Sequence, residues 1–157
     1  MTSADSVSPL AGEWTGVNRL WMSPQDEPQQ SDGTASVTLI GQGQFMAFRY
    51  TWAYEGAPQD GLLLVGIENP NATAVWTDSW HMSRNLMVCA RDSGREGTIS
   101  VSGTYPAPPG PDWGWRVAVR LEPAGLVLRM FNIPPGDAEQ LAVEAVYARG
   151  TPSGLAR

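Results

Sequence analysis

The sequence contains no lysine, one cysteine and one histidine. Without lysine it cannot form a Schiff base or use a lysine nucleophile. The single thiol, Cys89, excludes an internal disulfide and a zinc site built from several cysteines. Cys89 follows the apolar residues 86–88, so we expect a buried, unreactive thiol rather than a nucleophile. His81 and scattered carboxylates give no ligand spacing for a metal, and we predict no metal site.

Long hydrophobic runs and basic clusters are also missing. No apolar run approaches the ~18 residues of a membrane-spanning helix. Residues 1–9 are polar and lack the charged-then-apolar order of a signal peptide. These features predict a cytoplasmic protein that does not contact membranes. The formal net charge of −6 and the lack of a basic patch argue against nucleic acid as a partner.

Glycine and proline are plentiful, with 17 and 13 residues, and suit a chain with many tight turns. Helical periodicity is absent. Instead, runs rich in β-branched and aromatic residues alternate with breaks at Gly, Pro, Asn or Asp. The strands that this pattern predicts are residues 12–22, 34–41, 45–54, 61–69, 72–79, 85–92, 96–105, 113–122, 124–132 and 139–149.

Ten strands with short connections and no crossover helix predict an antiparallel up-and-down meander. A meander of that length would leave two exposed edges unless it closed on itself. We therefore predict an all-β fold, a single closed barrel of about ten strands, with a β-sandwich as the alternative. The barrel would span residues 10–150, with flexible ends at residues 1–9 and 151–157.

Two predicted strands depart from the pattern of a wall that is apolar inside and polar outside. Residues 45–54 carry bulky side chains on one face, and the sequence does not determine which face of this strand points inward. Residues 61–69 are apolar on both faces. Their outer side would need a cover, either the 24–33 loop or a second subunit, so a homodimer is one expectation. Arg49 and Arg129 lie in such apolar segments, and either could project inward to meet a carboxylate ligand or Asp78.

Three segments carry a family resemblance: residues 12–16 (GEWTG), 75–79 (VWTDS), which follow the turn-like residues 41–45 (GQGQF), and 145–149 (AVYAR). Their order and spacing resemble a bacterial lipocalin-like domain family of unknown function in the calycin superfamily, distantly similar to nitrobindin and fatty-acid-binding proteins. The resemblance implies a calycin barrel whose floor is closed by Trp14, with Arg149 of the last strand packed over the indole. This pair would be structural rather than catalytic.

The same resemblance raises the question of haem, because nitrobindin-like proteins bind haem through a histidine in the final strand. The matching residues 139–149 (EQLAVEAVYAR) contain no histidine. We therefore expect no haem and no other cofactor.

The densest cluster of chemically useful side chains is residues 76–84. Period-two alternation places Trp76, Asp78 and Trp80 on one strand face. If Asp78 points inward between the two indoles, desolvation would raise its pKa, as in a general acid or base. The alternative is that Asp78 caps a turn or pairs with an arginine. His81 is the second acid–base candidate, or a solvated residue at a strand end.

We predict that the barrel holds a small, mostly apolar or aromatic molecule in its lumen. The competing prediction is an enzyme, a small-molecule cyclase or isomerase of bacterial secondary metabolism, in which Asp78 or His81 transfers a proton. A third alternative is a filled barrel that acts only through an interface. The expected ligand contacts are Phe48, Arg49, Tyr50, Trp52, Trp76, Asp78, Trp80, His81, Trp115, Met130 and Tyr147.

Overall fold

The computed structural model describes residues 7–67, 73–92 and 98–150. A short 3-10 helix, η1 (Ser8–Leu10), is followed by ten strands. No helix among these residues is long and apolar enough to cross a membrane. The strands are β1 (Gly12–Leu20), β2 (Gln29–Ile40), β3 (Phe45–Tyr54), β4 (Ala57–Gly66), β5 (Thr73–Asp78), β6 (Met87–Arg91), β7 (Thr98–Tyr105), β8 (Trp113–Glu122), β9 (Gly125–Ile133) and β10 (Gln140–Arg149).

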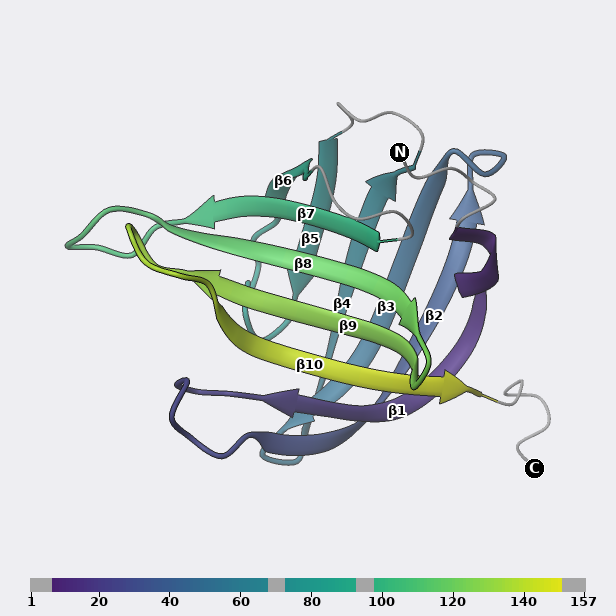
Figure 1. Cartoon of the computed structure of the whole chain (residues 1–157), viewed down its shortest axis with the longest axis horizontal. Coiled ribbons are helices and arrows are strands. Elements are labelled where there is room, and N and C mark those ends of the chain that lie inside the picture. The colour runs from purple at the N-terminus through teal and green to yellow at the C-terminus, as the bar shows by residue number, and fades with distance from the viewer. Residues whose placement is uncertain (1–6, 68–72, 93–97, 151–157) are drawn as a thin grey trace.

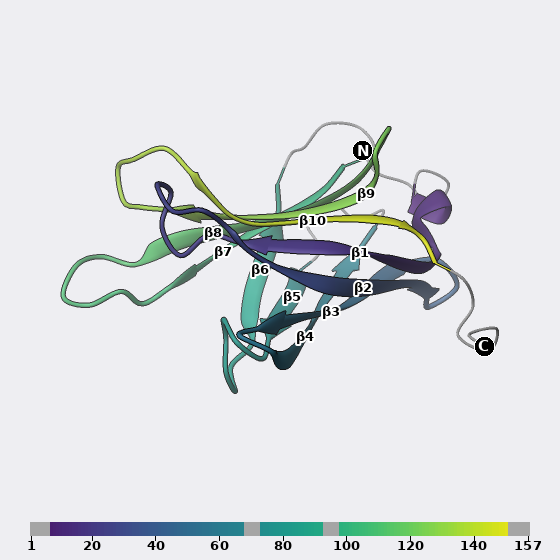
Figure 2. The same cartoon turned by 90° about the horizontal axis from the view of Figure 1, so that it is seen from below.

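The ten strands close into one antiparallel barrel, in which each strand pairs with its neighbours in the chain and β1 pairs with β10. The predicted all-β, up-and-down barrel is therefore confirmed, and the alternative β-sandwich is wrong. Strands β7–β10 cross in front of the steeper strands β2–β6, which form the opposite wall (Figures 1 and 2). Closure satisfies the hydrogen-bonding groups that an open meander would expose at its edges.

The largest differences from the predicted strand boundaries are at the starts of β2 and β4. Strand β2 begins at Gln29 rather than at residue 34, because residues 29–33 pair in register with the second half of β1. Strand β4 begins at Ala57, because the turn from β3 needs only Glu55 and Gly56, both with positive φ. Such a turn fits the twist of a hairpin.

The alternation along β3 fixes which of its faces points inward. Met46, Phe48, Tyr50 and Trp52 are all buried, whereas Arg49 and the other residues of the opposite row are exposed or half-buried. The bulky row that includes Tyr50 therefore lines the interior.

One end of the barrel is closed by Trp14 and Arg149. The Trp14 Nε1 donates a hydrogen bond to the carbonyl of Leu10, at 2.8 Å. The guanidinium carbon of Arg149 lies 4.1 Å from the centre of the Trp14 ring, a cation–π arrangement. Arg149 also donates hydrogen bonds to the carbonyls of Ala11 and Pro9, at 2.6 and 2.5 Å. These contacts fasten the segment before β1 across the barrel floor.

A steric constraint explains why the first residue of the GEWTG segment is glycine. Gly12 has a φ of +124°, which L side chains rarely adopt, and a Cβ atom there would lie 2.8 Å from Nη1 of Arg149. Before it, Val7 is fully buried. Val7 belongs to the hydrophobic core and directly precedes η1. Residues 1–6 and 151–157 lie outside the described part of the chain.

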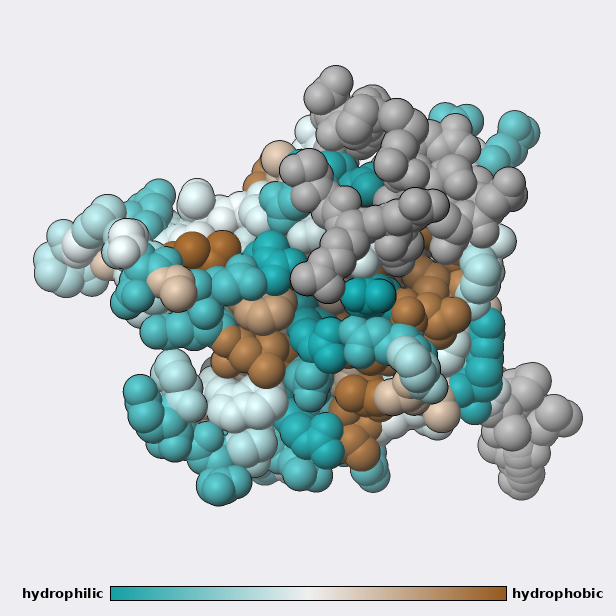
Figure 3. All heavy atoms as spheres, viewed as in Figure 1, coloured by the Kyte–Doolittle hydropathy of each residue, from teal (hydrophilic) through white to brown (hydrophobic). Residues whose placement is uncertain are grey.

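The opposite end is formed by the connections 21–28, 55–56, 79–86, 106–112 and 134–139, because alternate connections of a meander lie at the same end. The connections after β7 and β9 project beyond the barrel wall (Figure 1). The face shown in Figure 3 mixes hydrophilic residues with separate hydrophobic patches. We call the Trp14 side the closed end and the other side the open end.

Candidate binding site

The inward row of β3 brings Tyr50 next to the end of β5. Tyr50 pairs across the sheet with Gly61 of β4, and Gly61 pairs in turn with Asp78. A Cβ atom at position 61 would overlap the Tyr50 ring and its hydroxyl group. Glycine therefore leaves the space through which Tyr50 crosses β4 and reaches Asp78.

The Asp78 carboxylate is fully buried and accepts hydrogen bonds from one strand, β3, and from the turn after β5. Its Oδ2 accepts from the Tyr50 hydroxyl at 2.7 Å and from the Trp52 indole at 3.1 Å. Its Oδ1 accepts from the backbone N–H groups of Trp80 and His81, at 2.8 and 2.9 Å. The carboxylate therefore caps the turn that follows β5 as well as joining β3 to β5.

These surroundings set the charge states of the buried groups. Burial raises the pKa of Asp78, but its contacts with His81 and Tyr50 outweigh burial and hold the pKa below its ordinary value. The structure therefore matches the alternative in which Asp78 caps a turn, and not the one in which desolvation raises its pKa. Burial and the Asp78 charge raise the pKa of Tyr50 well above its ordinary value. At neutral pH Asp78 is therefore ionised and Tyr50 is protonated.

The imidazole of His81 lies beside this carboxylate. Its Nδ1 is 3.1 Å from Asp78 Oδ1, and only 13% of the side chain is exposed. The ring also lies among indoles, with its centre 5.4 Å from that of Trp115 and 5.9 Å from that of Trp76. Since Nδ1 faces Asp78, Nε2 is the nitrogen left for other partners.

A cavity of about 370 Å³ lies beside His81. Its walls come from the turn 79–86 and from the parts of β5–β9 that adjoin the open end. The lining residues are Trp76, Trp80, His81, Met82, Met87, Tyr105, Trp115 and Asn132. The cavity therefore lies at the open end, away from Trp14.

Aromatic rings form much of this wall, with few polar atoms among them. The Trp76 and Trp115 rings stack with centres 5.3 Å apart and an interplanar angle of 22°. On another side, the Tyr105 hydroxyl donates a hydrogen bond to Asn132 Oδ1 at 2.5 Å. The described residues offer no partner to the Asn132 amide N–H groups, which leaves donors for a ligand.

The predicted contact residues fall into three sets. Trp76, Trp80, His81 and Trp115 line the cavity itself. Asp78 lies behind the wall, where it holds the turn and His81. The remaining inward residues belong to the packed interior next to these groups: Phe48, Tyr50, Trp52, Met130 and Tyr147.

The two arginines that we considered for the lumen both lie outside it. Arg49 is exposed on the outer face of β3, since alternation puts it opposite the inward row. Arg129 pairs with two carboxylates, Glu122 at 2.7 Å and Glu144 at 2.8 Å, on the outer surface. Neither guanidinium meets Asp78 or the cavity.

Four lining residues were missed by the sequence argument: Met82, Met87, Tyr105 and Asn132. A signal for two of them was present. Tyr105 shares a strand face with buried aliphatic residues of β7, and Asn132 follows Met130 on the inward face of β9. A polar residue on an otherwise apolar inward face is a candidate ligand contact.

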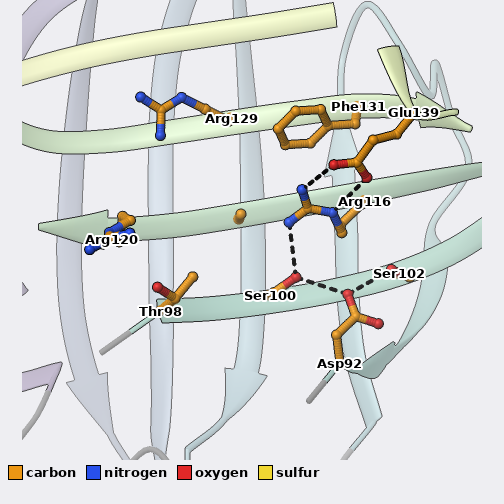
Figure 4. Close-up of a pocket in the computed structure, with 10 residues that line it drawn as sticks. Asp92, Thr98, Ser100, Ser102, Arg116, Arg120, Arg129, Phe131 and Glu139 are labelled. Carbon is orange, nitrogen blue, oxygen red and sulfur yellow. Dashed lines mark hydrogen bonds and ion pairs between the residues drawn. The ribbon is translucent and has the colours of Figure 1, made fainter. Parts of the chain in front are cut away.

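A larger concave surface, of about 600 Å³, lies on the outside of β7–β9 (Figure 4). Arg116 crosses its centre and donates hydrogen bonds to Glu139 at 3.0 and 2.6 Å and to Ser100 at 3.3 Å. Ser100 and Ser102 in turn donate to Asp92 at 2.8 and 2.7 Å. Its central charges are paired with one another, so we assign this surface a structural role.

Metal and haem chemistry find little support in the residues present. No three His, Cys, Asp or Glu residues of the described chain cluster in a way that could hold a metal. The final strand supplies no histidine that could ligate haem. Cys89 is buried in β6, and burial raises the pKa of its thiol to about 11, which leaves it unreactive.

Comparisons with known proteins agree with the barrel and leave its activity open. The crystal structure of Rv2717c from M. tuberculosis has a similar fold, with a TM-score of 0.62 over 94% of this chain and 96% of that chain. The two sequences are 16% identical, so the likeness concerns the fold alone. Comparison with curated proteins gives no match. The family model described as "Protein of unknown function (DUF1579)" matches residues 5–149. The chain therefore belongs to the DUF1579 family.

Proposed function

We propose that this protein binds a small, largely apolar or aromatic molecule in the cavity at its open end. The observation that carries the proposal is the cavity wall, in which three indoles and two methionines surround one histidine. Its volume of about 370 Å³ lies within the range of small-molecule sites, which are mostly apolar with a few placed polar groups. The resemblance of the sequence to a lipocalin-like domain family of the calycin superfamily supports the same function.

Each group of residues has a separate role in this proposal. Trp76, Trp80 and Trp115 contact the faces of the ligand, and His81 supplies a polar contact through Nε2. Asp78 positions His81 and the turn rather than touching the ligand. The buried side chains behind them, Phe48, Tyr50, Trp52, Met130 and Tyr147, give the wall its shape. Neither a cofactor nor a nucleic acid takes part, and we place the protein in the cytoplasm.

The test is a calorimetric titration with 3-propylindole, a neutral aromatic probe. Wild-type protein should bind it, and Met82→Trp should weaken binding at least tenfold, because the larger side chain occupies the cavity. Met22→Trp is the matched control, since Met22 is 51% exposed and does not line the cavity. Equal binding by both variants, or no binding by the wild type, would contradict the proposal.

A second candidate function follows from the carboxylate–imidazole contact of Asp78 and His81, at 3.1 Å. Such a pair can act as a general base if His81 Nε2 faces a C–H bond of the ligand, as in a cyclase or isomerase. Native mass spectrometry of protein from its own source would identify a co-purifying molecule. An enzyme should exchange hydrogen of that molecule for deuterium in D₂O and should lose the exchange in His81→Gln. A carrier should produce no exchange in either protein.

A homodimer remains a proposal that the outer surface supports. Leu64, Val75 and Val88 lie side by side across β4, β5 and β6 on the outward face. Val88 is 66% exposed, and Leu86 near it is 65% exposed. Such an apolar row is typical of an interface. Analytical ultracentrifugation should give a dimer that Val88→Glu dissociates, and a monomeric wild type would contradict this.

A further inference from the structure

Charge is distributed unevenly around the cavity. No arginine is among the described residues that line it, and the chain has no lysine. The Asp78 carboxylate lies directly behind the wall, in contact with the lining residues Trp80 and His81. Because the pKa of Asp78 is held below its ordinary value, this buried group stays ionised at neutral pH. The wall therefore has the negative charge of Asp78 behind it.

The aromatic wall has the same electrostatic preference. The faces of Trp76, Trp80 and Trp115 carry the negative end of the ring quadrupole, and Tyr105 adds a fourth ring. Such faces attract a cation within about 6 Å of the ring centre, most strongly where water is excluded. A carboxylate in the same place would meet the ring faces and the Asp78 charge, with the Asn132 amide as a donor but no guanidinium among the described lining residues.

We propose that the ligand is an organic cation, an amine carried on a small apolar or aromatic skeleton. This inference rests on the proposed function, since it names the class of molecule that the same cavity takes. The skeleton would pack against the indoles and methionines, and the ammonium group would lie near the ring faces on the side of Asp78. The cavity would discriminate against carboxylates, contrary to the expectation of an inward Arg49.

The test compares three probes that share the indole ring and differ in the charge of the side chain: tryptamine, 3-propylindole and indole-3-propionate. Calorimetry at pH 8.5 keeps an ordinary amine protonated and an ordinary carboxylate ionised. Tryptamine should bind about tenfold more tightly than 3-propylindole, and indole-3-propionate at least tenfold more weakly than 3-propylindole. Equal affinity for amine and neutral probe, or tightest binding of the carboxylate, would overturn the inference and leave the proposed function standing. No binding of any probe would contradict both.

Substitutions in the protein test whether the charge of Asp78 causes the preference for tryptamine over 3-propylindole. Asp78→Asn should reduce the ratio of the tryptamine affinity to the 3-propylindole affinity from about tenfold to about twofold. An unchanged preference in a variant that binds 3-propylindole would contradict the role of the Asp78 charge. If Asp78→Asn fails to fold, Asn132→Lys serves instead, because it places a cation in the wall and should make indole-3-propionate the tighter ligand. Gln30→Lys, on the exposed part of β2, adds the same charge elsewhere and should leave the order unchanged. An unchanged order in Asn132→Lys would overturn the inference.

Discussion

At the scale of single residues, Asp78 decides the geometry of the site. Its carboxylate joins Tyr50 and Trp52 of β3 to the turn that carries His81. The sequence pattern placed Asp78 on one face with two indoles, but its pKa is lowered mainly by contacts with His81, three residues away, and also by the Tyr50 hydroxyl, 28 residues away. Alternation along the strand identifies neither contact, because the turn after β5 brings His81 back to Asp78 and strand pairing brings Tyr50 to it.

Replacing Asp78 should therefore reveal both its hydrogen bonds and its charge. We expect Asp78→Asn to lower the free energy of unfolding at pH 7 by about 2–4 kcal/mol, because an amide leaves buried donors without an acceptor. Denaturant unfolding measures this difference. Asp26→Asn, an exposed position in the 21–28 connection, should change stability by less than about 0.5 kcal/mol.

The pH dependence has a definite sign. A pKa depressed by folding means that the unfolded chain binds more protons, so stability from Asp78 is present above the unfolded pKa and is lost on acidification. The loss should begin below about pH 4, where an ordinary aspartate titrates. The difference between wild type and Asp78→Asn should shrink from pH 7 to pH 3. A difference that stays constant over this range contradicts the assignment.

At the scale of strands, alternation predicted most of the wall and left one contact of the cavity undetermined. It placed Tyr105 with the buried face of β7 and put Arg49 opposite the bulky row of β3. It did not predict that the Tyr105 hydroxyl would bond to Asn132 of β9. That contact depends on how β7, β8 and β9 are paired in register, which hydrophobic periodicity does not determine.

The Tyr50 crossing of β4 gives a second prediction. Gly61→Ala should displace the Tyr50 ring and break its 2.7 Å hydrogen bond to Asp78, because the added Cβ overlaps the ring. We expect a loss of about 2–4 kcal/mol in the free energy of unfolding. Gly110→Ala is the control, since its nearest neighbour for a Cβ is 3.9 Å away. Equal stability of Gly61→Ala and Gly110→Ala would show that the position of the Tyr50 ring does not depend on the missing Cβ atom at Gly61.

Strand β6 is the least tightly paired part of the described wall. It pairs with β7 only at Ala90 and Arg91, whereas β9 pairs along most of its length on both sides. Amides of β6 should therefore exchange with deuterium well before those of β9. Because Met87 of β6 lines the cavity, a bound ligand should slow this exchange. Equal protection of the β6 and β9 amides from exchange in the free protein would contradict the assignment of β6 as the most weakly paired strand.

At the scale of the whole molecule, the barrel has one closed end and one open end. The closed end was predicted through the resemblance of two segments at opposite ends of the sequence, which β1–β10 pairing brings together at Trp14 and Arg149. The cavity lies at the other end. Stability and ligand preference should therefore be separable.

Trp14→Ala tests this separation. The side chain is 3% exposed, and its removal should lower the free energy of unfolding by about 3–5 kcal/mol. Affinity for 3-propylindole should stay within about twofold of wild type at a temperature where the variant is folded. An altered ligand preference with unchanged stability would show that the closed and open ends have been assigned the wrong way round.

The central claim is that the open-end cavity binds a small aromatic molecule, and its most direct test uses the indole N–H groups as reporters. The seven tryptophans give separate signals in a ¹H–¹⁵N spectrum during a titration with 3-propylindole. The signals of Trp76, Trp80 and Trp115 should move in a saturable way, and that of Trp14 should not. A titration that moves none of these three signals, or moves Trp14 alone, would contradict the proposed site.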